Sequence, residues 1–166
     1  MSSKNYQSIR QLSGGTDYTE ICPRLYLGND YSFYHKRFDG SAIVNLTQKP
    51  ITKDKTHSSL YLFVPPATHS NNIGVFLKPI HTFITEKLNK GCNVLVFCED
   101  GNDRAACALV YHLYITQQLT PSNPLQSYSV TDVIKFIQEK RPSVHISSDN
   151  LQQLAGAFKI ANVEAN

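Results

Sequence analysis

Short apolar runs alternate along this chain with longer stretches whose apolar residues recur at helical spacing. The runs have the length and composition of buried strands, and they cover residues 25–27, 41–46, 60–64 and 93–97. Helical spacing follows in residues 77–90, 104–118, 129–141 and from 148 onward. Strands that alternate with helices predict an α/β fold: a central, mostly parallel sheet of four to five strands with helices on both faces.

Local signals place two of the helix starts. Pro79 fits the first turn of a helix, where its missing N–H is not needed, so that helix is expected to begin near Leu77 and to end at Gly91. Ser129 and Asp132 have the spacing of a capping pair, which predicts another helix start. Residues 65–72 are turn formers throughout and predict a loop.

Composition limits the classes of protein to which the chain can belong. Its 166 residues are 41% hydrophobic and 17% charged, which suits one domain with a proper core. The polar residues 1–17 predict a flexible lead-in, and residues 18–166 a single domain. A net charge of +3 is too small to predict nucleic acid as a partner. No apolar run approaches the ~20 residues that span a bilayer, so no transmembrane segment is expected.

The four cysteines are Cys22, Cys92, Cys98 and Cys107. They resemble neither a disulfide framework nor the Cys/His spacing of a zinc site. We therefore expect free thiols, no metal and no cofactor. Because the N-terminus also lacks a secretory signal, the expected location is cytoplasmic.

The segment from Val94 to Arg104, with the sequence VLVFCEDGNDR, carries the chemistry. Cys98 ends a buried strand, Gly101 lies in the middle of a tight turn, and Arg104 begins a helix. Inward backbone N–H groups and the helix N-terminus predict an anion site, where the Arg104 guanidinium can hold two phosphate oxygens. The same positive field is expected to lower the pKa of Cys98 and to make its thiolate a nucleophile.

Together with residues 21–28 (ICPRLYLG), residues 43–47 (IVNLT) and the pair Arg141-Pro142, this segment resembles the cysteine-dependent protein tyrosine phosphatase superfamily, and within it the compact dual-specificity branch. The likeness runs from Tyr18 to Phe158. It implies phosphoester hydrolysis through a phosphocysteine, on a phosphorylated protein or a phosphoinositide. Cys98 would be the nucleophile. The phosphoryl group would be bound by Arg104 and by the loop amides of Glu99, Asp100, Gly101, Asn102, Asp103 and Arg104.

The chain departs from the family pattern in three places. Phe97 stands where the family has histidine, and Ala105 where it has serine or threonine. Both family residues help to hold the thiolate, so their loss is expected to raise the pKa of Cys98 and to slow turnover. The family takes its general acid, an aspartate, from the loop that corresponds to residues 65–72, which contain no carboxylate here. A missing general acid costs about 10²–10⁴ in rate.

The anion loop itself contains three carboxylates, Glu99, Asp100 and Asp103. If all of them pointed inward they would repel phosphate, so we expect most of them to point outward. The pattern Cys–x–Asp–Gly–x–Asp–Arg resembles the loop of the myotubularin phosphoinositide phosphatases, in which loop acids replace the missing general acid. This resemblance makes Asp103 the candidate acid and Asp100 the second. The alternative for Asp103 is a carboxylate stabilised by the helix dipole.

Several other polar residues have two interpretations. His69 could donate a proton from the 65–72 loop, or be a solvated loop histidine. Cys92 and Cys107 could pair oxidatively with Cys98, although a core position is favoured for Cys107. His112 and Tyr114 are assigned to the core or the surface rather than to ligand binding. A basic stretch could attract an acidic substrate or form a solvated loop; it comprises Lys49, Lys53 and Lys55.

Two other functions compete with hydrolysis. A pseudophosphatase would keep the anion site as a binding module with little or no turnover, which Phe97, Ala105 and the acid-free loop favour. A sulfur transferase of the rhodanese type also uses a cysteine in a short loop after a strand. The arginine six residues after Cys98 disfavours that second alternative.

Overall fold

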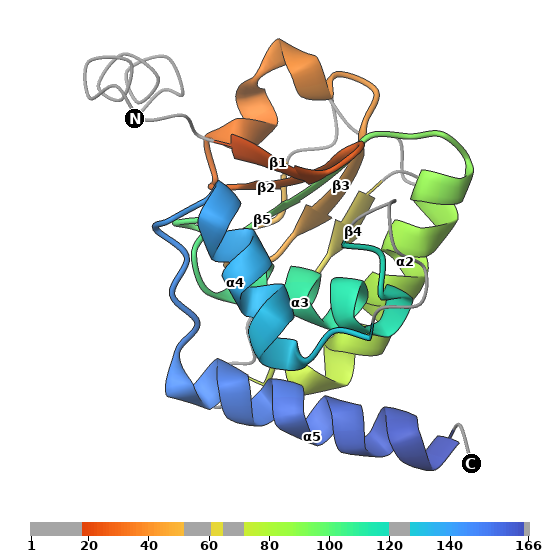
Figure 1. Cartoon of the computed structure of the whole chain (residues 1–166). Helices are drawn as coiled ribbons and strands as arrows, with labels where there is room; N and C mark the ends of the chain where they lie inside the picture. Colours follow the sequence, from red (N-terminus) through yellow and green to blue (C-terminus); the bar gives the residue numbers. More distant parts are fainter. Residues whose placement is uncertain (1–17, 52–60, 65–71, 120–126, 165–166) are drawn as a thin grey trace.

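The computed structural model describes residues 18–51, 61–64, 72–119 and 127–164. Within these residues, five strands form one sheet in the order β1-β2-β5-β3-β4. The strands are β1 (Tyr18–Cys22), β2 (Leu25–Gly28), β3 (Ala42–Asn45), β4 (Tyr61–Phe63) and β5 (Val94–Phe97). Only β1 and β2 pair antiparallel, and the other three pairings are parallel. The predicted, mostly parallel sheet is confirmed (Figure 1).

Helices cover both faces of this sheet, as predicted, but the two faces differ in kind. The α-helices of the described residues lie on one face, and they are α2 (Leu77–Asn89), α3 (Arg104–Thr116), α4 (Val130–Lys140) and α5 (Ser148–Glu164). The other face is covered by the short 3-10 helices η1 (Ser32–Tyr34) and η2 (Lys36–Phe38), and a further one, η5 (Gly74–Phe76), leads into α2.

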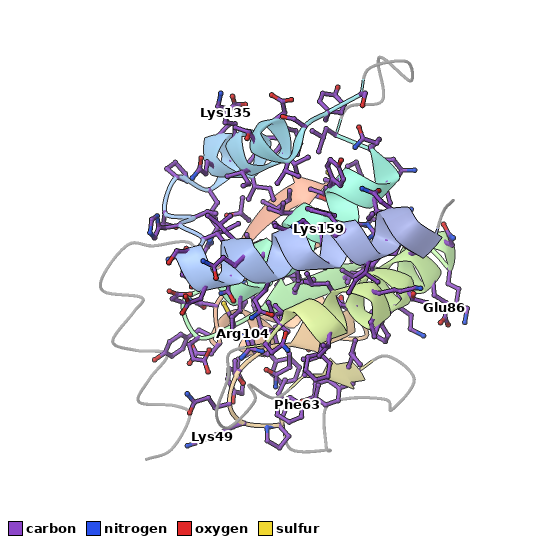
Figure 2. All side chains as sticks on the ribbon, turned by 90° about the horizontal axis from the view of Figure 1, so that it is seen from below. Lys49, Phe63, Glu86, Arg104, Lys135 and Lys159 are labelled. Carbon is purple, nitrogen blue, oxygen red and sulfur yellow. The ribbon has the colours of Figure 1, made fainter. Side chains whose placement is uncertain are left out.

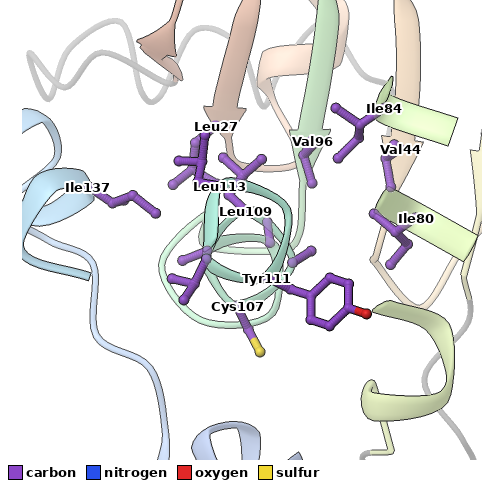
Figure 3. Close-up of a cluster of buried hydrophobic side chains, with 14 of the residues drawn as sticks. Leu27, Val44, Ile80, Ile84, Val96, Cys107, Leu109, Tyr111, Leu113 and Ile137 are labelled. Carbon is purple, nitrogen blue, oxygen red and sulfur yellow. The ribbon is translucent and has the colours of Figure 1, made fainter. Parts of the chain in front are cut away.

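The main core surrounds α3. Every residue of this helix from Arg104 to Leu113 is buried, because the sheet, α2, α4 and α5 all pack against it. Figure 3 shows α3 end on, with Leu27 and Val96 of the sheet on one side and Ile137 of α4 on another. A second, smaller cluster fills the opposite face of the sheet and contains Tyr26, Phe33, Phe38, Ile43, Leu95 and Phe97.

Both predicted helix starts are confirmed, and that of α4 has the expected capping geometry. Pro79 lies in the first turn of α2, and the chain leaves that helix through Gly91 at a φ of 80°. Ser129 caps α4: its hydroxyl accepts from the N–H of Asp132 at 3.2 Å, and the Asp132 carboxylate accepts from the N–H of Ser129 at 2.9 Å. The helix expected to reach residue 118 ends at Thr116, because Gln117 adopts a left-handed conformation.

None of the helices in the part of the chain that the structure describes is long and apolar enough to cross a membrane. The predicted lead-in, residues 1–17, lies outside the described residues.

Candidate active site

The cysteine and the arginine of the predicted anion site lie at the two ends of one tight turn. β5 ends at Phe97, residues 98–103 form the turn, and α3 begins at Arg104. Because β5 lies between β2 and β3 and runs parallel to both, Cys98 emerges in the middle of the carboxyl edge of the sheet. Parallel sheets bind their ligands beyond this edge. We call the turn the 98–103 loop.

Gly101 occupies a position in this loop that no other residue could fill without strain. Its φ of 72° lies in the left-handed region, where a Cβ is unfavourable. A Cβ would also lie 2.6 Å from the carbonyl carbon and oxygen of Gly28 and 2.8 Å from a guanidinium nitrogen of Arg141. The outer side of the loop is therefore closely packed against β2 and against the residue that follows α4.

The inner side of the loop surrounds the sulfur of Cys98. The backbone N–H of Ala105 donates to Sγ at 3.5 Å, and the N–H groups of Gly101 and Asp103 act in the same direction by lowering the pKa of the thiol. The N–H of Asn102 is used within the loop instead, because it donates to Oδ1 of Asp100 at 2.9 Å. A backbone donor beside a thiol, at the start of a helix, suits a tetrahedral anion.

Cys98 itself is a buried thiol, with 2% of its surface exposed. Burial raises its pKa to about 11; the N–H of Ala105 and the other loop amides oppose this shift, and the carboxylate of Asp100 adds to it. The S–H group donates to Oδ1 of Asp100 at 3.5 Å. A thiol with this pKa is ionised in roughly one molecule in 10⁴ at pH 7.

The lowered pKa that the positive field of the loop predicted for Cys98 is therefore wrong, because desolvation outweighs the loop amides. The raised pKa expected from Phe97 and Ala105 has the right direction. Phe97 points to the other face of the sheet, where its ring stacks on Phe33 with centroids 6.3 Å apart. Ala105 is fully buried and offers the sulfur only its backbone N–H.

Arg104 is held inside the molecule at the start of α3, with 9% of its surface exposed. Figure 2 labels Arg104 near the start of α3, behind the ribbon of α5 that carries Lys159. Burial lowers the pKa of its guanidinium, which still stays charged. Its Nε is buried and has no hydrogen-bond partner among the described residues. A buried, unpaired donor of this kind costs free energy unless a ligand accepts from it.

The three carboxylates of the loop point in different directions. Oε1 of Glu99 accepts from the N–H of Gln48 at 2.9 Å, on the side of β3. Oδ1 of Asp103 accepts from the N–H of Ser147 at 2.9 Å and from Nδ2 of Asn150 at 2.8 Å, at the start of α5. Only Asp100 contacts the sulfur. As expected, most of the negative charge is turned away from the centre of the loop.

The structure adds residues to the site that sequence reasoning did not place there. Arg141 donates to the carbonyl oxygens of Asp100 and Gly101, and Asn150 binds Asp103. The Arg141-Pro142 pair was visible as part of a family resemblance, but nothing in the sequence linked it to the loop. Asn150 lies only two residues into a helix predicted for its apolar spacing, and no sequence signal singled it out.

Other predicted residues lie apart from the loop or outside the description. His69, Lys53 and Lys55 belong to segments that the structure does not describe. All four cysteines are free thiols; Cys107 is buried, faces α5 in Figure 3 and donates to the carbonyl of Asn150 at 3.6 Å. Lys49 is an exposed residue beyond β3.

His112 and Tyr114 of α3, predicted to be core or surface groups, both contact neighbouring aromatic rings. His112 is buried against His81 of α2, with 3.1 Å between their Nδ1 atoms, and the ring of Tyr114 lies 4.4 Å from that of Phe158. Within the described ranges, no group of three or more His, Cys, Asp or Glu side chains is arranged to hold a metal ion.

Comparisons with solved structures agree with this architecture. Human DUSP28 superposes with a TM-score of 0.70 at 16% identity, over 89% of this chain and 97% of its own. The human tyrosine phosphatase-like serine/threonine/tyrosine-interacting protein gives 0.69 at 23% identity, over 87% and 97%. PTPMT1 in complex with PI(5)P gives 0.69 at 15% identity, over 91% and 100%. At these identities the likeness establishes the fold alone.

Sequence comparison adds the family. A curated relative, named "Putative tyrosine phosphatase 123R" of Invertebrate iridescent virus 6, is 24% identical over 138 residues, which cover 82% of this chain and 89% of the viral protein. The family model described as "Dual specificity phosphatase, catalytic domain" matches residues 25–159, which contain the sheet from β2 onward, the 98–103 loop and Arg141. The chain therefore belongs to the dual specificity phosphatase family.

Proposed function

We propose that this protein hydrolyses phosphoesters through a phosphocysteine formed on Cys98. The observation that carries the proposal is the buried Cys98 sulfur, which accepts from the backbone N–H of Ala105, in a loop that ends at a buried arginine with an unpaired Nε. In this scheme the sulfur attacks phosphorus, and the S–P bond forms as the bond to the leaving oxygen breaks. Arg104 and the loop amides stabilise the equatorial oxygens of the transition state.

The proposed mechanism needs an acceptor for the proton of the Cys98 thiol. Because the thiol is protonated at neutral pH, its proton has to leave as the S–P bond forms, and the nearest acceptor is Oδ1 of Asp100 at 3.5 Å. Asp100 is exposed, so the proton that it takes up can pass to the leaving oxygen. Asp103, the first candidate from the sequence, stays a predicted acid. Its two hydrogen bonds to the start of α5 make Asp100 the better supported of the two.

A phospho-ligand-binding module with little turnover is the second candidate function. The buried, protonated thiol favours it, since binding through Arg104 and the loop amides does not need a thiolate. The structural neighbours include a protein described as phosphatase-like and interacting, in addition to named phosphatases.

The proposed substrates are phosphotyrosine, phosphoserine or phosphothreonine in proteins, with phosphoinositides as the other class. The viral relative is named a tyrosine phosphatase, which supports the first class, and one structural neighbour was solved with a phosphoinositide, which supports the second. The cytoplasmic location expected from the cysteines stays a prediction.

One set of measurements separates catalysis from binding. We would assay wild type, Cys98→Ser, Asp100→Asn and Asp103→Asn on p-nitrophenyl phosphate, whose leaving group needs little protonation, and on a phosphoserine peptide, whose leaving group needs a proton. Hydrolysis that Cys98→Ser abolishes supports the phosphatase. Loss confined to the peptide identifies an aspartate that only protonates the leaving group, and loss on both substrates identifies one that also takes the proton of the thiol. A wild type that binds tungstate but hydrolyses neither substrate would establish the binding module instead.

A further inference from the structure

The outer side of the 98–103 loop is held by one guanidinium group. Arg141 follows α4, and only 8% of its surface is exposed. Its Nε donates to the carbonyl oxygen of Gly101 at 3.2 Å, and one of its terminal nitrogens donates to the carbonyl oxygen of Asp100 at 3.4 Å. The other terminal nitrogen donates to the hydroxyl of Thr19 on β1 at 3.3 Å. Arg141 thus connects two successive peptide groups of the loop to the edge of the sheet.

Because peptide groups are planar, these outer contacts also fix the direction of the N–H groups on the inner side of the loop. In a trans peptide the carbonyl oxygen of one residue and the N–H of the next point in opposite directions. The carbonyl of Asp100 points to Arg141, and accordingly the N–H of Gly101 points the opposite way, to the inner side of the loop, where it helps to lower the pKa of Cys98. Rotation of this peptide would therefore withdraw a donor from the phosphate site and break the contact with Arg141 together.

The next peptide places the proton acceptor by the same rule. The carbonyl of Gly101 points to Nε of Arg141, and the N–H of Asn102 points the opposite way, to Oδ1 of Asp100. That oxygen is the one that accepts from the Cys98 thiol at 3.5 Å. One arginine thus orients both the amide of Gly101 and the amide that holds the carboxylate beside the sulfur.

The residues after Arg141 continue this contact along the loop. The N–H of His145 donates to the carbonyl oxygen of Asn102 at 3.0 Å, and the hydroxyl of Ser143 donates to Oδ1 of the same residue at 2.8 Å. Again the following N–H, that of Asp103, points away from this contact, and it too lowers the pKa of Cys98. The connection between α4 and α5 therefore contacts the loop from Asp100 to Asn102, and Arg141 is its only charged contact to the loop carbonyls among the described residues.

We propose that Arg141 is a positioning residue of the phosphate site: it fixes the peptide groups of Asp100 and Gly101 so that the loop presents its N–H groups and the Asp100 carboxylate to the reacting atoms. The inference rests on the proposed phosphate-binding role of the loop. Lysine cannot replace this arginine, because the contacts diverge from three nitrogens held in one plane.

The test compares Arg141→Gln with a variant that weakens the same helix without touching the loop. Ser129→Ala removes the capping box of α4. It is expected to lower the melting temperature about as much as Arg141→Gln does. Tungstate serves as the probe, and its dissociation constant is measured by calorimetry for each folded protein. Thr19→Val, which removes only the distant hydroxyl partner, is the milder variant should Arg141→Gln fail to fold.

We expect Arg141→Gln to bind tungstate about 10- to 100-fold more weakly than wild type, Thr19→Val about 3-fold more weakly, and Ser129→Ala with unchanged affinity. Equal tungstate affinities in wild type, Thr19→Val and Arg141→Gln would overturn the inference. So would an affinity loss that Ser129→Ala shares.

An NMR measurement tests the positioning role of Arg141 independently of the proposed catalysis. In protein without tungstate, the amide resonance of Gly101 is expected to shift in Arg141→Gln and to stay in place in Ser129→Ala, because only the first change frees the Asp100–Gly101 peptide. This signal requires neither turnover nor anion binding. An inactive wild type whose Gly101 resonance responds in this way would refute the phosphatase proposal and leave the positioning role intact. An unchanged Gly101 resonance in Arg141→Gln would refute the positioning role whatever the activity.

Discussion

The thiol of Cys98 donates a hydrogen bond to Oδ1 of Asp100 across 3.5 Å, and the same oxygen accepts from the N–H of Asn102 at 2.9 Å. The Asp100 carboxylate is thus held beside the thiol by the loop itself. A carboxylate at this place favours the neutral thiol over the thiolate, since two like charges would otherwise face each other. It is also the nearest base for the proton that the thiol must lose.

Asp100→Asn is expected to lower the pKa of Cys98, because the carboxylate that raises it is gone while the loop amides remain. The rate of alkylation by iodoacetamide between pH 7 and 9 should then rise about 3- to 10-fold. Glu99→Gln, which removes a charge directed at Gln48, is the matched control and should change the rate less. An unchanged alkylation rate in Asp100→Asn would show that Asp100 has no influence on the thiol.

Gly101→Ala is expected to destabilise the protein by about 2–4 kcal/mol, because the left-handed backbone and the 2.6 Å approach to Gly28 act together. Gly40→Ala separates the two effects: Gly40 has a φ of 76°, yet nothing lies within 4 Å of its added Cβ. That control should cost only about 1 kcal/mol. Urea denaturation measures both variants. Equal losses would mean that packing around Gly101 contributes nothing.

Buried His112, which contacts the half-buried His81, makes stability depend on pH. Burial, and secondly the charge of His81, lowers the pKa of His112 to about 4. In the unfolded chain the same group titrates near 6.5, so below that pH the unfolded state binds the extra proton first. The stabilisation present above pH 6.5 is therefore lost as the pH falls towards 4. At pH 5 this loss amounts to about 2 kcal/mol.

Replacing His112 by leucine is expected to flatten this dependence. Urea denaturation at pH 7.5 and at pH 5 should show a smaller difference in the free energy of unfolding for His112→Leu than for wild type. His35→Gln changes an exposed histidine and should keep the wild-type difference. A His112→Leu variant that loses as much stability at pH 5 as wild type would contradict the assignment.

Asp103 and Asn150 are expected to contribute jointly to stability, because their 2.8 Å hydrogen bond connects the start of α3 to the start of α5. Asp103→Ala leaves Nδ2 of the fully buried Asn150 without this acceptor and should cost about 1–3 kcal/mol. A double-mutant cycle with Asn150→Ala should give a coupling energy of about 0.5–3 kcal/mol. If the losses in the free energy of unfolding of the two variants were strictly additive, the hydrogen bond between Asp103 and Asn150 would not stabilise the fold. That result would strengthen the case for Asp103 as the acid.

The sequence by itself determined the architecture and the core of the site. Apolar runs and helical spacing are local properties of the chain, so they predicted the parallel sheet and the α-helices, and the capping pair at Ser129 predicted the start of α4. The spacing of Cys98, Gly101 and Arg104 likewise required no distant residue to be recognised as an anion loop. The end of α3 was placed two residues too late, because Gln117 has no strong local preference for its left-handed backbone.

Only the tertiary structure decided the pKa of Cys98 and the residues that hold the loop in place. The pKa of Cys98 depends on how much protein covers its sulfur, and burial is a property of the assembled layers rather than of any segment. The partners of the loop, Arg141 and Asn150, are about 40 and 47 residues distant from the groups they bind. Their contacts exist because α4 and α5 pack against α3 and bring the α4–α5 connection across the loop, and no periodicity in a sequence records such an approach.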